Sequence, residues 1–531
     1  MNFIENYQKT MGNESSEGSE LSPESLVTLL SSIAGEYLSK LHGEVIDFSF
    51  LLRPFYNLYV YIYANSSYLE PTETNNSDDQ FIFNNINGLS ETEFNGKVHH
   101  LIYGLSKSDD INASISSILT SEFKETAPVD TGVLSKLPNT DHDRKQIGIS
   151  LSFTVIERII LKCRLQGKIR FVKIEKSSND SVEVNSNIRL SMLDSLSNHI
   201  DVKRLCEKEY RLLLSSILFM PTYFVEKFTS CYLNAKQYAN GLRSLVCGIE
   251  FQHKPVQAVL LAILKEKSTS LIGSQHGGFY GQTDPTWLER SEREIFDRYI
   301  TWGFEFSKNE YPLPSVRLSR KRLGDVALLM KRHFLRPKAK TVLVVLPHIM
   351  PTLAYSIQSP RVMQQQQALY RSLTMLELLV DAGYEVTLRT HPRNPPLDYE
   401  AAIPGRLKSA VVVCGGKAGP LVEAMLQFEW VFFTNPNATG LSECVANGIE
   451  FRIVSDPHDY QIRTDAAQVY QSLQSNNVWF TEKAQLNHLS KERGKEARLK
   501  AIDQFMQMYG LHSKKYLQAW VNYINVLKAD L

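Results

Sequence analysis

The stretch 430-WVFFTNPNATGLSECVANGIEFRIVS-455 contains a strand–helix–strand unit in its pattern of apolar residues. Residues 430–435 and 449–455 are short apolar runs rich in β-branched and aromatic residues, which predicts strands. Residues 440–448 are predicted as a short helix between them. Strands that alternate with helices are typical of a parallel sheet, so the stretch predicts a doubly wound α/β domain.

The same alternation extends upstream of this unit. It predicts further strands at 341–347, 384–390 and 409–414, with helices at 361–383 and 419–427. Still earlier, it predicts a helix at 256–268 and strands at 269–274 and 298–303. A chain of 531 residues is too long for one ordinary core, so we expect two such domains.

Helical segments flank these two predicted domains. Residues 24–64 have helical apolar spacing, and the end of the chain is helical and rich in Lys, Gln and aromatic residues. The predicted parts are an N-terminal Rossmann-like domain with a helical extension (1–305), a connection (306–338), a C-terminal Rossmann-like domain (339–485) and C-terminal helices (486–531).

The overall charge and the cysteines limit the class of protein. The formal net charge is +1, which gives no general reason to expect nucleic acid as a partner. The start, MNFIENYQKT, lacks the pattern of a signal peptide, and no apolar run approaches the roughly 18 residues of a membrane span. Six scattered cysteines without a CxxC pair are typical of reduced thiols. We therefore expect a cytoplasmic protein.

Candidate site residues follow the predicted strands, because ligands of open α/β sheets bind beyond the carboxyl ends of the strands. In 389-RTHPR-393, Pro392 restricts His391 to an extended conformation between Arg389 and Arg393. Arginine makes forked contacts with phosphate, so the motif predicts a phosphate clamp. The alternative is a turn proline with surface arginines.

A second candidate is the start of the helix predicted at 440–448. Its unpaired N–H groups form a natural anion site. We expect Thr439 to cap this helix and bond a phosphate oxygen, and Glu443 to accept hydrogen bonds from ribose hydroxyls. An ordinary N-cap with a first-turn glutamate is the alternative.

The segment 275-QHGG-278 follows the strand predicted at 269–274. Adjacent glycines cost backbone entropy, which a fold accepts where the chain turns sharply or a ligand approaches the backbone. His276 could act as a general base, bind an acceptor hydroxyl or stabilise a leaving phosphate. The alternative is a structural histidine in a turn.

Three carboxylates downstream, Asp284, Glu289 and Glu292, are candidates for activating an acceptor hydroxyl; the alternative for each is a surface charge. The triplet 141-DHD-143 has the spacing of a metal-binding DxD motif, but no apolar strand precedes it. No Walker loop, GxGxxG, GxSxG or HExxH motif is present. We expect no metal and no cofactor beyond a co-substrate.

Taken together, these motifs resemble those of bacterial surface-carbohydrate transferases, relatives of the capsule Kdo transferases and more distantly of the CDP-glycerol polymerases. The matching segments are 41–63, 275-QHGGFYG-281, 297-DRYITWGF-304, 389-RTHPR-393 and 439-TGLSECVANGIEF-451. The resemblance implies a GT-B architecture, in which two Rossmann-like domains face each other across a cleft. It also implies metal-independent transfer.

The resemblance assigns roles to the candidate residues. His391 and Arg393 would bind the donor phosphate, and Thr439 and Glu443 the nucleotide, within a C-terminal domain that holds the nucleotide sugar. The segment 275–278, which comprises Gln275, His276, Gly277 and Gly278, would face the cleft from the acceptor-side domain. The general base would be His276 or a nearby carboxylate.

We therefore expect a glycosyltransferase of capsule or O-antigen synthesis. The expected donor is a CMP-activated nonulosonate of Kdo, sialic or pseudaminic type, and the acceptor an oligosaccharide or lipid-linked glycan. Alternatives are a UDP-sugar, GDP-sugar or CDP-glycerol donor, or a non-catalytic scaffold of a glycan assembly complex. The basic stretch 316–334 fits a solvated interdomain helix or a peripheral contact with the inner face of the cytoplasmic membrane.

Overall fold

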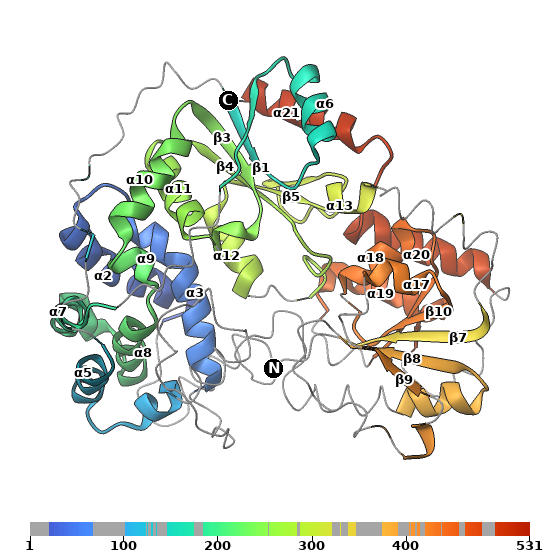
Figure 1. Cartoon of the computed structure of the whole chain (residues 1–531), viewed down its shortest axis with the longest axis horizontal. Helices are drawn as coiled ribbons and strands as arrows, with labels where there is room; N and C mark the ends of the chain where they lie inside the picture. Colours follow the sequence, from blue (N-terminus) through green and yellow to red (C-terminus); the bar gives the residue numbers. More distant parts are fainter. Residues whose placement is uncertain are drawn as a thin grey trace.

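The computed structural model has two lobes, each built around a six-stranded parallel sheet (Figure 1). It describes residues 21–66, 101–123, 125, 129–130, 134, 146–174, 184–252, 254–283, 287–320, 330, 338–346, 374–390, 403, 405–408, 411–414, 420–436, 438–455, 462–480 and 494–530. The two sheets confirm the predicted pair of Rossmann-like α/β domains.

The first sheet has the strand order β2-β1-β3-β4-β5-β6. Its strands are β1 (Gln146–Ser150), β2 (Ile169–Phe171), β3 (Leu242–Cys247), β4 (Ser270–Ser274), β5 (Arg298–Thr301) and β6 (Glu310–Pro312). The strands predicted at 269–274 and 298–303 are β4 and β5. Because β6 pairs with β5, the first sheet continues past residue 305 into the segment predicted as the connection.

Helices cover both faces of the first sheet, and a helical layer extends from one of them (Figure 1). The predicted helical region 24–64 forms two helices that pack against each other, α2 (Pro23–His42) and α3 (Phe48–Ser66). The other elements are α5 (Ile111–Glu122), α6 (Val155–Arg164), α7 (Ser186–Ser197), η3 (Ile200–Arg204), α8 (Glu207–Phe219), α9 (Thr222–Val225), α10 (Phe228–Ala239), η4 (Ile249–Gln252), α11 (Pro255–Glu266), α12 (Trp287–Ile295) and α13 (Val316–Ser319). Among the described helices, none is both long and apolar enough to cross a membrane.

The second sheet has the order β12-β11-β10-β7-β8-β9. Its elements are β7 (Lys338–Val345), β8 (Glu385–Arg389), η6 (Gly405–Leu407), β9 (Val411–Cys414), α17 (Leu421–Met425), β10 (Phe428–Phe433), α18 (Thr439–Ala446), β11 (Phe451–Val454), α19 (Thr464–Ser475) and β12 (Trp479–Phe480). Every strand predicted in this half is present. The helix predicted at 361–383 is described only from residue 374, and Gly383 follows it with a φ of 80°.

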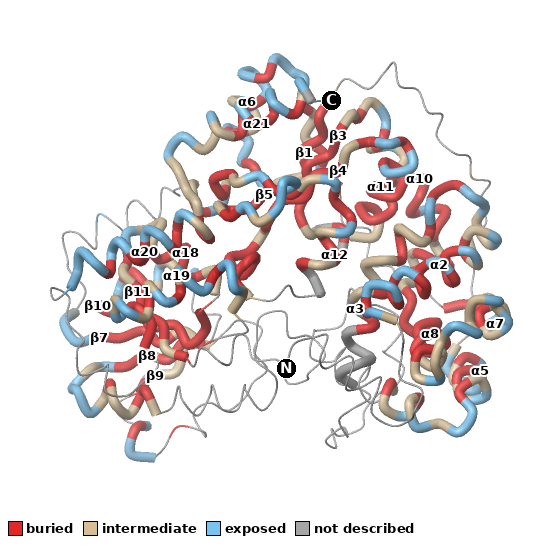
Figure 2. The backbone as a smooth tube through the Cα atoms, turned by 180° about the vertical axis from the view of Figure 1, so that it is seen from behind, coloured by how far each residue is buried: buried red, intermediate tan, exposed pale blue. Residues whose placement is uncertain are grey.

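Apolar residues on both sides of the strands explain why the sheets are buried on both faces. In β3, Leu245 and Cys247 enter the core on one face, and Val246 enters the core on the other. Successive strand residues point to opposite faces, so a continuous apolar run needs cover on both. Figure 2 shows the resulting buried band along the strands.

The C-terminal helices join the two lobes. Helix α20 (Lys495–Tyr509) packs on α18 and α19, whereas α21 (Tyr516–Asp530) returns to α6 in the first lobe. At the crossing, Leu511 N–H donates to the Trp302 carbonyl over 2.8 Å. Gly303 has a φ of 129°, and a Cβ there would lie 2.1 Å from the carbonyl oxygen of Gln507. This close approach of two backbones requires glycine.

Candidate active site between the two sheets

The loop after β4 touches the start of α18 in the other domain. Gly278 N–H donates to Thr439 Oγ1 over 2.9 Å. Beside this contact, Arg463 N–H donates to the Gln282 carbonyl over 3.1 Å, and Thr283 forms an antiparallel bridge with Ile462. The carboxyl ends of the two sheets therefore face each other, which is the GT-B arrangement.

The contact explains the two adjacent glycines. A Cβ on Gly278 would lie 2.9 Å from Thr439 Cα, and a Cβ on Gly277 would lie 2.8 Å from the Phe279 ring. Neither glycine has a positive φ. The chain does turn here, but without a positive φ the turn does not itself require glycine: Gly278 makes room for the backbone of Thr439, and Gly277 for the ring of Phe279.

The side chain of Gln275 holds the loop after β4 in place through two hydrogen bonds. It is buried, its amide nitrogen donates to the Gly277 carbonyl, and its amide oxygen accepts from Trp302 N–H, both over 2.7 Å. These bonds tie the end of β4 to the end of β5. The side chain predicted to face the cleft thus serves the loop that carries His276.

A chain of hydrogen bonds runs from His276 into the core of the first domain. His276 Nδ1 lies 2.7 Å from the Tyr280 hydroxyl, which donates to Glu292 over 2.6 Å. The Tyr299 hydroxyl donates to the other oxygen of Glu292. The Glu292 side chain is completely buried, whereas 35% of the His276 side chain is exposed.

These hydrogen bonds select one tautomer of His276. Because the Tyr280 proton is directed at Glu292, the Tyr280 oxygen accepts the proton on Nδ1 of His276. In a neutral imidazole of this form, Nε2 is the nitrogen that accepts a proton. A histidine held this way, with a polar group behind Nδ1, has the orientation required of a general base.

Burial controls the charge of Glu292. Loss of hydration raises the pKa of this carboxyl to about 8; the two tyrosine hydroxyls oppose the shift and nearby Glu289 adds to it. Burial also raises the pKa of Tyr280 and Tyr299 well above the usual value. At neutral pH Glu292 therefore holds a proton. A proton on the oxygen that faces Tyr299 reverses the hydrogen bond between these two groups, leaves the other oxygen to accept from Tyr280, and removes the buried negative charge.

We predict that Glu292→Gln flattens the pH dependence of stability. The pKa of Glu292 is about 8 in the folded chain and about 4.3 in an unfolded one, so between these values the folded state binds more protons. Its contribution to stability accordingly falls as pH rises from about 5 to 8, by at most about 1.4 kcal/mol per pH unit. Urea unfolding at pH 5, 6, 7 and 8 measures this slope. Parallel curves for variant and wild type would contradict the assignment.

The other candidate carboxylates lie differently. Glu289 is buried beneath the loop, where it pairs with Arg293 over 3.1 Å and accepts from Gly281 N–H over 3.4 Å. Arg293 also pairs with Glu310, so Glu289 belongs to a buried ion-pair network.

Asp284 and the triplet 141–143 lie outside the described residues. Within the described residues, no group of three or more His, Cys, Asp or Glu side chains could hold a metal ion.

In the second domain, the prediction that Thr439 caps α18 is wrong. Ala438 is the N-cap, and Thr439 is the first helical residue, whose hydroxyl accepts from Gly278. Glu443 pairs with Arg317 of α13, and 14% of its side chain is exposed. Arg389 ends β8 and is buried. His391 and Arg393, together with most of the basic stretch 316–334, lie outside the described residues.

Sequence reasoning missed Tyr280 and Tyr299. Tyr280 and His276 have the i, i+4 spacing at which side chains of one helical turn meet, and this spacing could have drawn attention to Tyr280. Tyr299 gives no such local signal, because only the packing of α12 on the sheet brings Glu292 to it.

A family model described as "LIC12162 family transferase" matches residues 44–524. The chain belongs to the LIC12162 transferase family. Members of this family are transferases by description. In this chain, His276 and its hydrogen bonds to Tyr280 and Glu292 lie where the two parallel sheets meet. A search of curated proteins finds no match to the chain.

Solved structures resemble this LIC12162 family member only distantly. A UDP complex of MnaA from S. aureus is 10% identical, with 73% of this chain and 98% of that chain covered and a TM-score of 0.39. MurG from Acinetobacter baumannii is 9% identical (72% and 99% covered, TM-score 0.34). The wall teichoic acid polymerase TagF is 10% identical (73% and 90% covered, TM-score 0.33). At such identities, substrate and reaction must be argued from the chain's own residues.

Proposed function

We propose that this transferase moves a nonulosonate sugar from a CMP-linked donor to a glycan acceptor during synthesis of a bacterial capsule or O-antigen. One observation carries the reaction type: His276, oriented by Tyr280 and Glu292, lies beside the start of α18 at the meeting of the two sheets. The resemblance of 275–281 and 389–393 to the Kdo transferases supports the CMP donor.

In the proposed step, Nε2 of His276 takes the proton of the acceptor hydroxyl. The acceptor oxygen forms a bond to the anomeric carbon of the sugar, and the bond from that carbon to the phosphate oxygen of CMP breaks. The electron pair stays on the phosphate. The N–H groups at the start of α18, with His391 and Arg393, would stabilise the charge on the departing CMP.

The acceptor is an oligosaccharide or a lipid-linked glycan. A lipid-linked acceptor would bring the protein to the inner face of the cytoplasmic membrane. In the donor alternatives His276 would still take the acceptor proton, but the bond that breaks differs. A UDP- or GDP-sugar would release the nucleoside diphosphate from the anomeric carbon, whereas with CDP-glycerol the acceptor oxygen would attack the phosphorus that bears glycerol and CMP would leave. If the protein were a non-catalytic scaffold, the hydrogen bonds that orient His276 would have no catalytic purpose.

Thermal-shift binding of CMP, CDP, UDP and GDP tests this proposal. A ligand that binds only the folded state stabilises it, by about 2.7 kcal/mol at a concentration one hundred times its Kd. We expect CMP to raise the melting temperature of wild type and of the control His199→Ala, but not of His391→Ala. His199 is a suitable control because it pairs with Glu36 in the helical layer.

The other outcomes overturn parts of the proposal. A shift with UDP or GDP alone would keep the transferase and replace the donor. A CMP shift that persists in His391→Ala would remove the HP motif from the donor site. If no nucleotide shifts the melting temperature, the scaffold alternative becomes the better explanation.

A further inference from the structure

Helix α6 turns an apolar face to the outside of the first lobe. Val155 is 72% exposed, Ile156 71% and Ile159 56%. These residues and the exposed Cys163 lie on one side of the helix, because residues three and four positions apart are neighbours on its surface. We call these four residues the α6 face. Exposed apolar residues scattered singly are ordinary, but a group on one side of a helix marks an interaction surface.

The inward side of α6 carries the only acidic residue of the helix. Glu157 is 5% exposed and accepts from the guanidinium of Arg320 over 2.6 and 2.9 Å. It also accepts from the Tyr516 hydroxyl and from Thr154 N–H. Arg320 follows α13, and Tyr516 begins α21, which lies beside α6 (Figure 1). These bonds hold α6 in place and keep its outward face free of acidic groups.

Basic side chains border the α6 face. By helical geometry, Arg158 and Lys162 flank it on one side and Arg164 on the other. Arg158 donates to the Phe153 carbonyl, and Arg164 donates to the amide oxygen of Gln518. Both acceptors are neutral, so these bonds do not cancel the positive charges.

The surrounding sequence adds to this charge. Residues 151–170 contain five basic residues and a single acidic one, the buried Glu157. The neighbouring helix α21 has its only acidic residue at its last position. The positive potential of such a surface favours an anionic partner.

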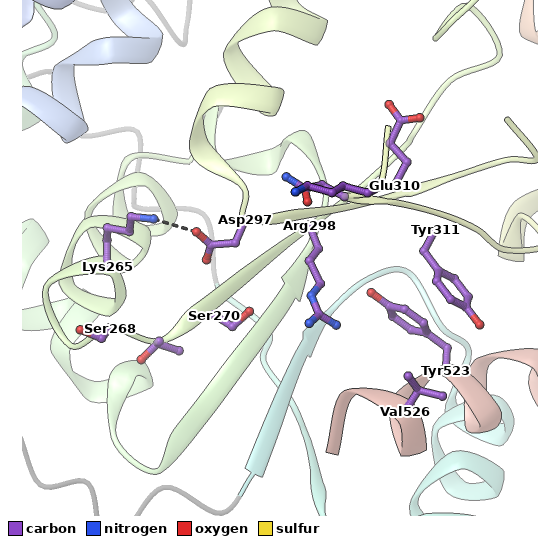
Figure 3. A pocket seen from close by; sticks show the side chains of 12 residues that line it. Lys265, Ser268, Ser270, Asp297, Arg298, Glu310, Tyr311, Tyr523 and Val526 are labelled. Atoms are coloured by element: carbon purple, nitrogen blue, oxygen red, sulfur yellow. Dashed lines mark hydrogen bonds and ion pairs between the residues drawn. The ribbon is translucent and has the colours of Figure 1, made fainter. Parts of the chain in front are cut away.

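The amino-terminal edge of the same sheet has a different character. The starts of β4 and β5 and helix α21 line a cavity of about 740 Å³ there (Figure 3). Its lining carries charges of both signs, including Lys265 and Asp297, which pair over 2.8 Å (Figure 3). An anionic surface therefore finds its complement at α6 and not at this edge.

The α6 face is connected to the candidate active site. Helix α6 begins just after β1 ends, at the same edge of the sheet as the loop of His276. Helix α13 links the start of α6 to the second lobe, because Arg320 at its end bonds Glu157 while Arg317 pairs with Glu443 of α18. A surface that docks on the α6 face would therefore lie on the side of the first lobe that carries the site.

We propose that the α6 face docks the protein on an anionic lipid bilayer. Val155, Ile156 and Ile159 would enter the boundary between headgroups and acyl chains. The basic residues on either side would remain among the headgroup phosphates, as in other helices that lie in a membrane interface. The proposal rests on the proposed function, since a lipid-linked acceptor gives the docking its purpose.

The test is co-sedimentation of the full chain with vesicles of phosphatidylethanolamine and phosphatidylglycerol. Wild type should bind these vesicles, bind phosphatidylcholine vesicles more weakly, and dissociate as salt is added. Replacing Ile156 and Ile159 together by serine should weaken binding at least about tenfold, because two apolar side chains lose their burial. Lys162→Gln should weaken it about fivefold.

Ile200→Ser is the matched control, because Ile200 is 76% exposed and lies in η3 of the helical layer. It should bind as wild type. If the double variant lowers the melting temperature, Ile156→Trp decides the case, since a larger apolar side chain at this exposed position should tighten binding.

Cys163 supplies a second measurement. A polarity-sensitive fluorophore attached to it should shift its emission to shorter wavelength when the anionic vesicles are added. Cys163→Ser, labelled in the same way, gives the signal of the other cysteines.

Four results would overturn the proposal: no binding of wild type to the anionic vesicles, unchanged binding of the double variant, equal binding to phosphatidylcholine vesicles, or no emission shift at Cys163. Dimers in analytical ultracentrifugation that the double variant abolishes, without vesicle binding, would assign the α6 face to a second copy of the chain. Vesicle binding needs no nucleotide, so its failure leaves the CMP result intact. A failed CMP experiment with normal vesicle binding would remove the donor and keep the docking surface.

Discussion

Replacing His276 by alanine is expected to lower kcat by about 10²–10⁴-fold, the usual contribution of a general base. The physical reason is the chain from Nδ1 through Tyr280 to Glu292, which leaves Nε2 as the proton acceptor. Nucleotide affinity should change little, because the imidazole is proposed to meet the acceptor and not the nucleotide. Initial rates of nucleotide release with a saturating donor measure kcat, and the thermal shift reports nucleotide binding separately.

Tyr280→Phe provides the matched variant for this experiment. It keeps the ring and removes the hydroxyl that links His276 to Glu292. As a positioning residue, Tyr280 should affect kcat more than KM, with a smaller loss than His276→Ala and a displaced pH–rate profile. A fully active His276→Ala variant would instead assign the base to a carboxylate such as Asp284.

Gly278→Ala is expected to reduce both stability and turnover by separating the two domains at their contact. The added Cβ would lie 2.9 Å from the Cα of Thr439, and a backbone atom cannot rotate away as a side-chain end can. Overpacking of this kind costs about 1–3 kcal/mol. The shift would also displace the start of α18 from His276, so we expect at least about a tenfold loss of kcat, because catalysis is sensitive to displacements near 1 Å.

Gly104→Ala is the control for this substitution. Gly104 is an exposed helical residue, and a Cβ there would meet no atom within 4 Å. Alanine should be neutral or slightly stabilising at that position. Chemical denaturation measures the stability of both variants, and initial rates measure their kcat. If Gly278→Ala were as stable and as active as Gly104→Ala, the two domains would not depend on this close contact.

The sequence predicted the elements of the α/β domains with few exceptions. The run 430–455 has its expected strand–helix–strand form, as β10, α18 and β11. These predictions succeed because strand and helix periodicity is a local property, written in neighbouring residues. The location of His276 at the end of β4 follows from the same local pattern and from the rule that parallel strands end at one edge.

The tertiary structure decided what the local pattern could not. Gly278 and Thr439 are 161 positions apart, and only their contact shows that the glycine makes room for a helix start and that Thr439 is not its cap. Glu292 reads as a surface charge on an amphipathic stretch, yet packing buries it beneath two tyrosines and raises its pKa to about 8. Local sequence determines which face of a strand or helix is apolar; which distant residues those faces meet, and therefore how a titratable group behaves, depends on the packing of whole domains.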